Sequence, residues 1–201
     1  MSEQPQIMDV FLDLFSNQPK NDQSREFFRQ VLRQRFEDTL TDAVERVWDL
    51  PPILVKPHGE YLVLLLETRQ LYLTGYFYSC VAMCGIVGER LIKDVFRTSV
   101  LIQKGGLAQL PSDTAFDQLE RVEVNGIIRF LKEADLLGAE AAKAGDSLSQ
   151  LRNQYAHARG KAPQSDALKA IKLLHTLVED TVSVFKEFEI RDGVLVRKAT
   201  P

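Results

Sequence analysis

Three polar side chains near the C-terminal end of the chain have the types and the spacing for acid–base chemistry on a bound anion. Arg152, Asn153 and His157 fall within the segment Arg-Asn-Gln-Tyr-Ala-His. An arginine holds an anion with a charge that persists at physiological pH, whereas a histidine gains and loses a proton near neutral pH. An arginine and a histidine on one surface therefore suit proton transfer beside a bound anion.

The segment 146–160 has the signals of a short helix with defined ends. Ser147 followed by Gln150 predicts a capping box at the start, and Gly160 predicts a left-handed stop at the end. His157 would then lie in the last helical turn, where the free carbonyl groups favour a cationic imidazole.

A helical wheel drawn at 100° per residue places the three polar residues outside the core. With Leu148 at 0°, Arg152 falls at about 40°, Asn153 at about 140° and His157 at about 180°. Ala156 lies inside this arc, and its small side chain leaves room for another backbone or a phosphate between Arg152 and His157. The opposite, apolar stripe consists of Leu148, Leu151, Tyr155 and Ala158.

The same pattern also fits a solvated face or an interface. In a chain of this composition, an arginine followed four to six residues later by a histidine is expected roughly 0.6 times by chance. The surroundings are locally basic, because Arg159 and Lys161 follow the motif and no acidic residue lies between Asp146 and Asp166. Arg159 is therefore a secondary candidate for anion contact.

Two segments together resemble a known family. The residues from Arg152 to His157 are similar to the Arg-polar-x3-His signature of the HEPN family, the higher eukaryotes and prokaryotes nucleotide-binding domains. The segment 75–92, Gly-Tyr-Phe-Tyr-Ser-Cys-Val-Ala-Met-Cys-Gly-Ile-Val-Gly-Glu-Arg-Leu-Ile, is similar to the second core helix of a HEPN branch of unknown function. That branch also tends to end with an acidic-Gly turn like Asp192-Gly193. The resemblance spans about residues 59–196.

The resemblance implies an all-helical bundle that pairs as a homodimer and, in catalytic members, cuts RNA without metal. Arg152 would hold the scissile phosphate, His157 would move the proton of the 2′-hydroxyl group, and Asn153 would orient either side chain. The alternative is a non-catalytic module of the same family that binds a nucleotide, RNA or an unidentified protein partner in a defence or stress system.

Glu89 is a further candidate with two interpretations. It follows Gly88 on the expected second core helix, from which it could reach the motif as a third polar group. Alternatively, it forms a surface pair with Lys93, since residues four apart on a helix are neighbours. The other two histidines predict little chemistry: His175 is expected to pack on its helix, and His58 lies in a proline-rich turn.

The overall composition predicts a globular protein that contacts RNA only locally. Of 201 residues, 45% are hydrophobic, and the net charge of −3 provides no general basic surface for nucleic acid. We expect neither a secretory signal nor a membrane span, which predicts a cytoplasmic protein. Cys80 and Cys84 are expected to be buried, reduced thiols. No cofactor is expected, and the scattered histidines predict no metal site.

Apolar periodicity predicts an all-α fold, an antiparallel helical bundle with an N-terminal helical extension and a small C-terminal β-hairpin. The expected domains are an extension over 1–58 and a HEPN-like bundle with the hairpin over 59–201. Gly85 and Gly88 lie within an expected helix, which predicts close packing against a neighbour. Residues 104–106 are expected to be loop. The expected helices cover 24–48, 61–73, 76–97, 114–131, the motif segment and a segment from 165 to about 185, and the hairpin covers 188–196.

Overall fold

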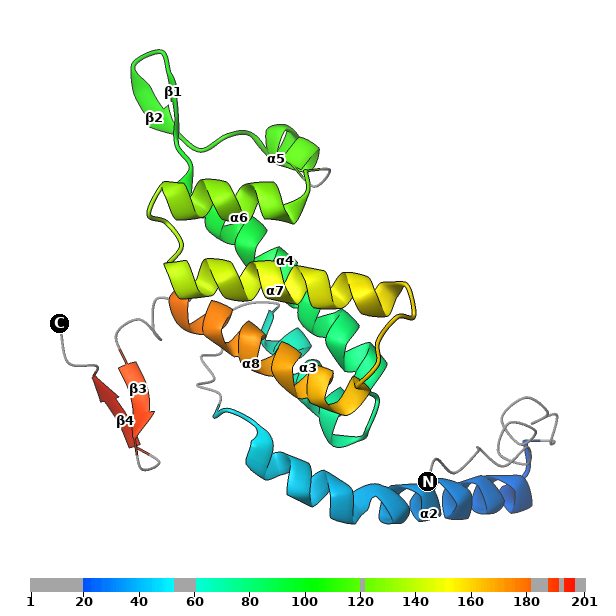
Figure 1. Cartoon of the computed structure of the whole chain (residues 1–201). Helices are drawn as coiled ribbons and strands as arrows, with labels where there is room; N and C mark the ends of the chain where they lie inside the picture. Colours follow the sequence, from blue (N-terminus) through cyan, green and yellow to red (C-terminus); the bar gives the residue numbers. More distant parts are fainter. Residues whose placement is uncertain (1–19, 53–60, 120–121, 182–187, 192–193, 198–201) are drawn as a thin grey trace. The chain divides into compact units, whose positions relative to one another are not determined.

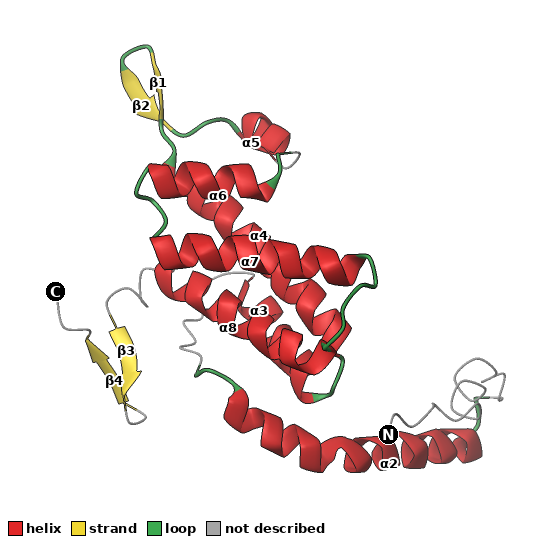
Figure 2. Cartoon of the chain, in the orientation of Figure 1, coloured by secondary structure: helices red, strands yellow, loops and turns green. Residues whose placement is uncertain are grey.

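The computed structural model describes residues 20–52, 61–119, 122–181, 188–191 and 194–197. Helices dominate these residues, and strands occur there only in two small antiparallel hairpins (Figure 2). The prediction of an all-α bundle with a C-terminal hairpin is therefore confirmed. The elements, in chain order, are α2 (Asp22–Asp49), α3 (Tyr61–Leu73), α4 (Phe77–Ser99), β1 (Ile102–Lys104), β2 (Leu107–Gln109), α5 (Asp113–Leu119), α6 (Val124–Glu133), α7 (Ala139–Ala156), α8 (Pro163–Thr181), β3 (Phe188–Arg191) and β4 (Val194–Arg197).

The chain forms two compact units, residues 1–41 and 42–201, and the division falls within α2. α2 begins at Asp22, two residues before the expected start, and the Asn21 side chain accepts a hydrogen bond from the Ser24 amide at 2.8 Å. Asn21 therefore caps this helix, and the start expected at residue 24 is too late. The domain boundary at residue 58 stays a prediction.

The helix α4 is the centre of the bundle and packs against α3, α6, α7 and α8; it crosses behind α7 in Figure 1. Its apolar residues recur every three or four positions and so form one buried stripe. This burial removes them from water, which is the main force that holds the helices together. The buried apolar residues of α4 are Cys80, Val81, Cys84, Val87, Leu91 and Ile92.

Glycines bring α4 and α7 close together, as the sequence predicts for α4. A Cβ atom built on Gly88 would lie 2.6 Å from Cδ2 of Leu148 on α7. A Cβ atom on Gly145 of α7 would lie 3.1 Å from the ends of both Ile92 and Ile128. The lost helix propensity of these glycines is offset by contacts that a larger residue would prevent.

The segment 114–131 forms two helices, so the prediction of one continuous helix is wrong. α5 ends at Leu119, and α6 begins at Val124 with Glu123 as its N-cap residue. The buried stripe of α6 consists of Val124, Ile127, Ile128 and Leu131. Apolar spacing alone did not reveal the break, because the residues before and after it follow the same period.

The segment around Gly105-Gly106 forms a β-hairpin, where only a loop is expected from the sequence. Ile102 pairs with Gln109 and Lys104 pairs with Leu107. Both turn glycines have positive φ angles, 62° and 81°, as a two-residue hairpin turn requires. Most side chains of these short strands are exposed, so no apolar alternation marks them in the sequence.

The C-terminal hairpin is present as predicted. β3 pairs with β4 in an antiparallel register from Phe188 opposite Arg197 to Arg191 opposite Val194. The expected turn, Asp192-Gly193, and the end of the expected helix, residues 182–185, lie outside the described residues, as does His58.

Cys80 and Cys84 are buried free thiols, as predicted. The Cys80 thiol donates a hydrogen bond to the Thr68 carbonyl oxygen at 3.3 Å. Hydrogen bonding to Cys80, together with burial, raises the pKa of the Cys84 thiol well above its usual value. The Cys84 thiol therefore packs as a protonated, apolar side chain.

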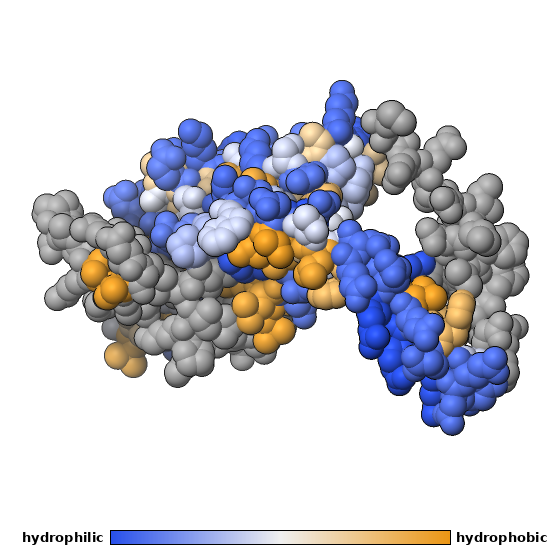
Figure 3. Space-filling view, turned by 90° about the horizontal axis from the view of Figure 1, so that it is seen from below, coloured by the Kyte–Doolittle hydropathy of each residue, from blue (hydrophilic) through white to orange (hydrophobic). Residues whose placement is uncertain are grey.

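Among the described residues seen in Figure 3, polar side chains predominate, and hydrophobic side chains form separate areas between them. Across the described part of the chain, no helix combines the length and the hydropathy needed to cross a membrane.

Candidate functional site

The helix that carries the motif is longer than the sequence predicts. α7 begins at Ala139, so Ser147 and Gln150 lie in its middle and the predicted capping box is wrong. The upstream residues Ala139 to Ala144 are mainly strong helix formers, which extend the helix beyond the false start. The true N-cap is Gly138, whose amide donates to the Asp180 carboxylate of α8 at 2.9 Å.

The helix α7 ends at Ala156, and His157 is its C-cap residue. Ala158 then adopts a left-handed conformation with a φ angle of 53°. The Arg159 amide donates a hydrogen bond to the Gln154 carbonyl oxygen at 2.8 Å. The Ala158 amide donates a hydrogen bond to the Tyr155 carbonyl oxygen at 3.0 Å. These bonds form a Schellman turn with alanine at the usual glycine position. The prediction that Gly160 supplies the left-handed stop is therefore wrong.

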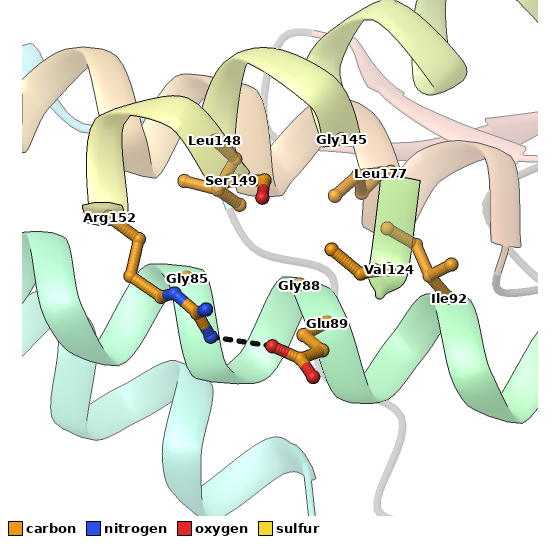
Figure 4. A pocket seen from close by; sticks show the side chains of 10 residues that line it. All are labelled: Gly85, Gly88, Glu89, Ile92, Val124, Gly145, Leu148, Ser149, Arg152 and Leu177. Carbon is orange, nitrogen blue, oxygen red and sulfur yellow. Dashed lines mark hydrogen bonds and ion pairs between the residues drawn. The ribbon is translucent and has the colours of Figure 1, made fainter. Parts of the chain in front are cut away.

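Arg152 lies across the contact between α7 and α4 (Figure 4). A Cβ atom on Gly85 would lie 2.6 Å from Cβ and Cγ of Arg152, so the glycine makes room for the arginine stem. The guanidinium donates through Nη1 to the Glu89 carboxylate at 2.5 Å. Its Nη2 atom also contacts Oδ1 of Asn153 at 3.4 Å. The structure thus brings together Arg152, Asn153 and Glu89.

Glu89 satisfies both of its predicted interpretations at once. Besides Arg152, its carboxylate lies 2.9 Å from the Lys93 ammonium one turn later on α4. Burial raises the pKa of Glu89, but hydrogen bonding and charge attraction from Lys93 and then Arg152 outweigh it, so the net pKa is lowered. Glu89 is therefore an anion held between two cations. Together, Glu89, Lys93 and Arg152 carry one net positive charge.

A small cavity lies between α4 and α7 beside this ion pair. It encloses about 10 Å³, about the volume that one water probe occupies. A nucleotide base cannot enter it, so a large anionic ligand would meet Arg152 from the exposed side. The lining includes Gly85, Gly88, Glu89, Gly145, Ser149 and Arg152 (Figure 4).

His157, Asn153 and Arg159 are exposed, whereas the Arg152 side chain is about one third exposed. Within the described part of the chain, the imidazole of His157 has no hydrogen bond or ion pair, and nothing joins it to Arg152. One copy of the chain therefore presents the arginine anchored and the histidine open to a ligand or a partner.

A cluster that the sequence did not single out fixes the turn after the motif. The Tyr155 hydroxyl donates to the Asp166 carboxylate of α8 at 2.7 Å, and the Tyr78 hydroxyl of α4 donates to the Gly160 carbonyl oxygen at 3.1 Å. The two tyrosine rings meet edge to face with centroids 4.7 Å apart. We call these residues, Tyr78, Tyr155, Gly160 and Asp166, the tyrosine clamp. The sequence marked Tyr155 only as apolar and Asp166 only as the end of a basic stretch.

α8 begins at Pro163, two residues before the expected start at 165, because proline suits the first helical position. Asp166 therefore lies in the first turn of α8, where a carboxylate is favoured by the helix dipole. His175 of α8 is partly buried, 3.4 Å from Glu179, and takes no part in the motif.

Across the described residues, no group of three or more His, Cys, Asp or Glu side chains is arranged to hold a metal ion. No family model matches the chain, and no curated protein or solved structure does.

Proposed function

We propose that the chain is a HEPN-like, cytoplasmic, metal-independent endoribonuclease whose active site is completed by a second copy of the chain. The observation that supports this most is the pairing of an anchored arginine with an open histidine at one end of α7. Arg152 is held through Glu89, whereas His157 is exposed at the C-cap. A phosphate-holding group must be fixed in place, and a proton-transfer group must be reachable.

The chemistry would be attack by an RNA 2′-hydroxyl on the adjacent phosphate. His157 accepts the hydroxyl proton, the oxygen bonds to phosphorus, and the bond to the 5′-oxygen of the next nucleotide breaks. The leaving oxygen takes a proton, which the His157 residue of the second copy can supply. Arg152 stabilises the negative phosphate, Asn153 orients its guanidinium, and Arg159 attracts neighbouring phosphates.

The direct test compares wild-type protein with His157→Ala on single-stranded RNA in the presence of a metal chelator. We expect wild-type protein to leave 2′,3′-cyclic phosphate ends and His157→Ala to cut about 10²- to 10⁴-fold more slowly with binding retained. His175→Ala is the matched control, since it removes a partly buried imidazole that lies on α8 and takes no part in the motif. Equal cleavage by wild type and His157→Ala, or cleavage that the chelator stops, would refute the assignment.

The homodimer is tested separately by light scattering at micromolar concentration. We expect twice the chain mass, because the exposed polar arc of α7 needs a symmetric partner to form a two-histidine cleft. A monomer that still cleaves RNA would remove the shared-site model but leave the chemistry in place.

One observation favours a second candidate, a non-catalytic HEPN-like module that binds a nucleotide, RNA or a protein partner. Glu89 already neutralises part of the Arg152 charge, and a purely binding site tolerates a histidine that stands apart from the arginine. Under this function, wild-type protein cleaves no RNA, and Arg152→Ala weakens RNA or nucleotide binding whereas His157→Ala does not.

A further inference from the structure

The turn that carries His157 is held by two helices. Its backbone is fixed to α7 by the Schellman bonds of Ala158 and Arg159. Its far end, Gly160, is fixed to α4 because the Gly160 carbonyl oxygen accepts a hydrogen bond from the Tyr78 hydroxyl group. His157 thus sits at the start of a short segment that is tied down at both ends.

Gly160 lies directly against the Tyr155 ring. A Cβ atom at this position would lie 2.3 Å from Cζ and 2.4 Å from Cε1 of Tyr155. Glycine is therefore required at Gly160 for space, and the ring serves as the surface on which the turn rests.

The Tyr155 ring is in turn fixed at both its edge and its hydroxyl group. Tyr78 packs against it edge to face, and the Asp166 carboxylate accepts a hydrogen bond from the Tyr155 hydroxyl group at 2.7 Å. Tyr155 is only 5% exposed, so the ring has little freedom to rotate away. The tyrosine clamp thus connects α4, α7 and α8 beneath the turn.

We propose that Tyr155 and Tyr78 are positioning residues that hold the His157 turn in one conformation for proton transfer. This inference rests on the proposed ribonuclease function for its effect on rate, but the hold on the turn can be measured without RNA. Misplacing a reacting group by about 1 Å can cost about 10²-fold in rate, so a loosened turn lowers the rate without removing any reacting group.

The variants are Tyr155→Phe and Tyr78→Phe, each of which removes one hydroxyl group and keeps the ring. The matched control is Tyr72→Phe on α3, which removes a hydroxyl that donates to the Asp49 carboxylate at 3.2 Å and does not touch the turn. Tyr72 is also buried, at 1% exposed, so its loss reports the general effect of a missing tyrosine hydroxyl in this core.

The first readout is hydrogen exchange of the Ala158 and Arg159 amides together with the NMR signals of the His157 imidazole. We expect faster exchange, by about tenfold, and shifted His157 signals in both turn variants but not in Tyr72→Phe. The second readout is RNA cleavage, for which we expect kcat to fall about 10- to 100-fold while KM changes less than about twofold.

Each outcome decides one proposal. Unchanged exchange and unchanged His157 signals in both turn variants would overturn the clamp. Faster exchange with a kcat equal to that of Tyr72→Phe would show a structural clamp and overturn the positioning role. Wild-type protein that cuts no RNA would refute the proposed function, whereas the exchange and NMR data would still decide whether the clamp holds His157.

Discussion

The Arg152 guanidinium and the Glu89 carboxylate lie 2.5 Å apart although 63 positions separate them in the sequence. The two side chains are only 33% and 26% exposed, and the arginine stem crosses Gly85. This pair therefore differs from a typical surface ion pair, in which both side chains are free to move. It links the motif of α7 to α4, and it sets where the guanidinium can meet an anion.

The first prediction concerns the strength of this pair. In a double-mutant cycle of Glu89→Gln and Arg152→Met, we expect a coupling free energy of about 1 kcal/mol, because the pair is partly shielded from water. The measurement is urea denaturation of the four proteins. The control pair is Arg25 with Asp22 on α2, 68% and 99% exposed, for which no coupling should be measurable. Equal coupling in the two cycles would show that Arg152 is not anchored.

The second prediction concerns acid stability. The pKa of Glu89 is lower in the folded state than in the unfolded state. Ionised Glu89 therefore stabilises the fold above its unfolded pKa, and this stabilisation is lost as the pH falls through the folded-state pKa. At pH values under about 4.5, we therefore expect the free energy of unfolding to decrease less steeply in Glu89→Gln than in wild-type protein. Thermal unfolding between about pH 3 and pH 7 measures the difference. Parallel curves would contradict the two-cation environment of Glu89.

The third prediction concerns the space at Gly85. Gly85→Ala places a Cβ atom 2.6 Å from the Arg152 stem, so we expect a loss of about 1–3 kcal/mol in the free energy of unfolding. The matched control is Gly126→Ala on α6, where a Cβ atom meets nothing within 4 Å. Helix propensity should make that variant more stable by about 0.5–1 kcal/mol. The same sign for both substitutions would argue against the close crossing.

The fourth prediction concerns the left-handed residue after α7. Ala158→Gly should stabilise the folded state by up to about 1 kcal/mol, because alanine at a φ angle of 53° carries a steric cost that glycine avoids. Chemical denaturation measures the change. Ala156→Gly, at the last helical position, is the control and should destabilise. A destabilised Ala158→Gly would mean that the Schellman turn does not form as described.

Elements with an apolar face were predictable from the sequence, whereas a helix start inferred from capping residues was not. The buried stripe of α4 follows the helical period, so its limits were found within two residues. The start of α7 was misplaced because Ser147 and Gln150 have the residue types of a cap without its position. A cap forms only where the helix upstream ends, and the alanine-rich segment 139–144 does not end there.

The candidate site was predictable only in part for a related reason. Spacing placed Arg152 and Asn153 on one arc of a helix, and the structure joins them. The contact of Arg152 with Glu89 depends on how α4 crosses α7, which the sequence suggests only through Gly85 and Gly88. The tyrosine clamp depends on a third helix, α8, and Asp166 has no local pattern that predicts its contact with Tyr155.

The central helix α4 also limits how far the motif could be moved to another protein. It supplies the space at Gly85, the carboxylate of Glu89 and the hydroxyl of Tyr78, and none of these lies in the six-residue motif. If residues 152–157 were grafted onto an unrelated helix, the arginine would lose its anchor and the turn would lose its support. A useful signature for such a site therefore combines the motif with a distant Tyr-x6-Gly-x3-Glu-x3-Lys pattern, which begins at Tyr78 and ends at Lys93 in this chain.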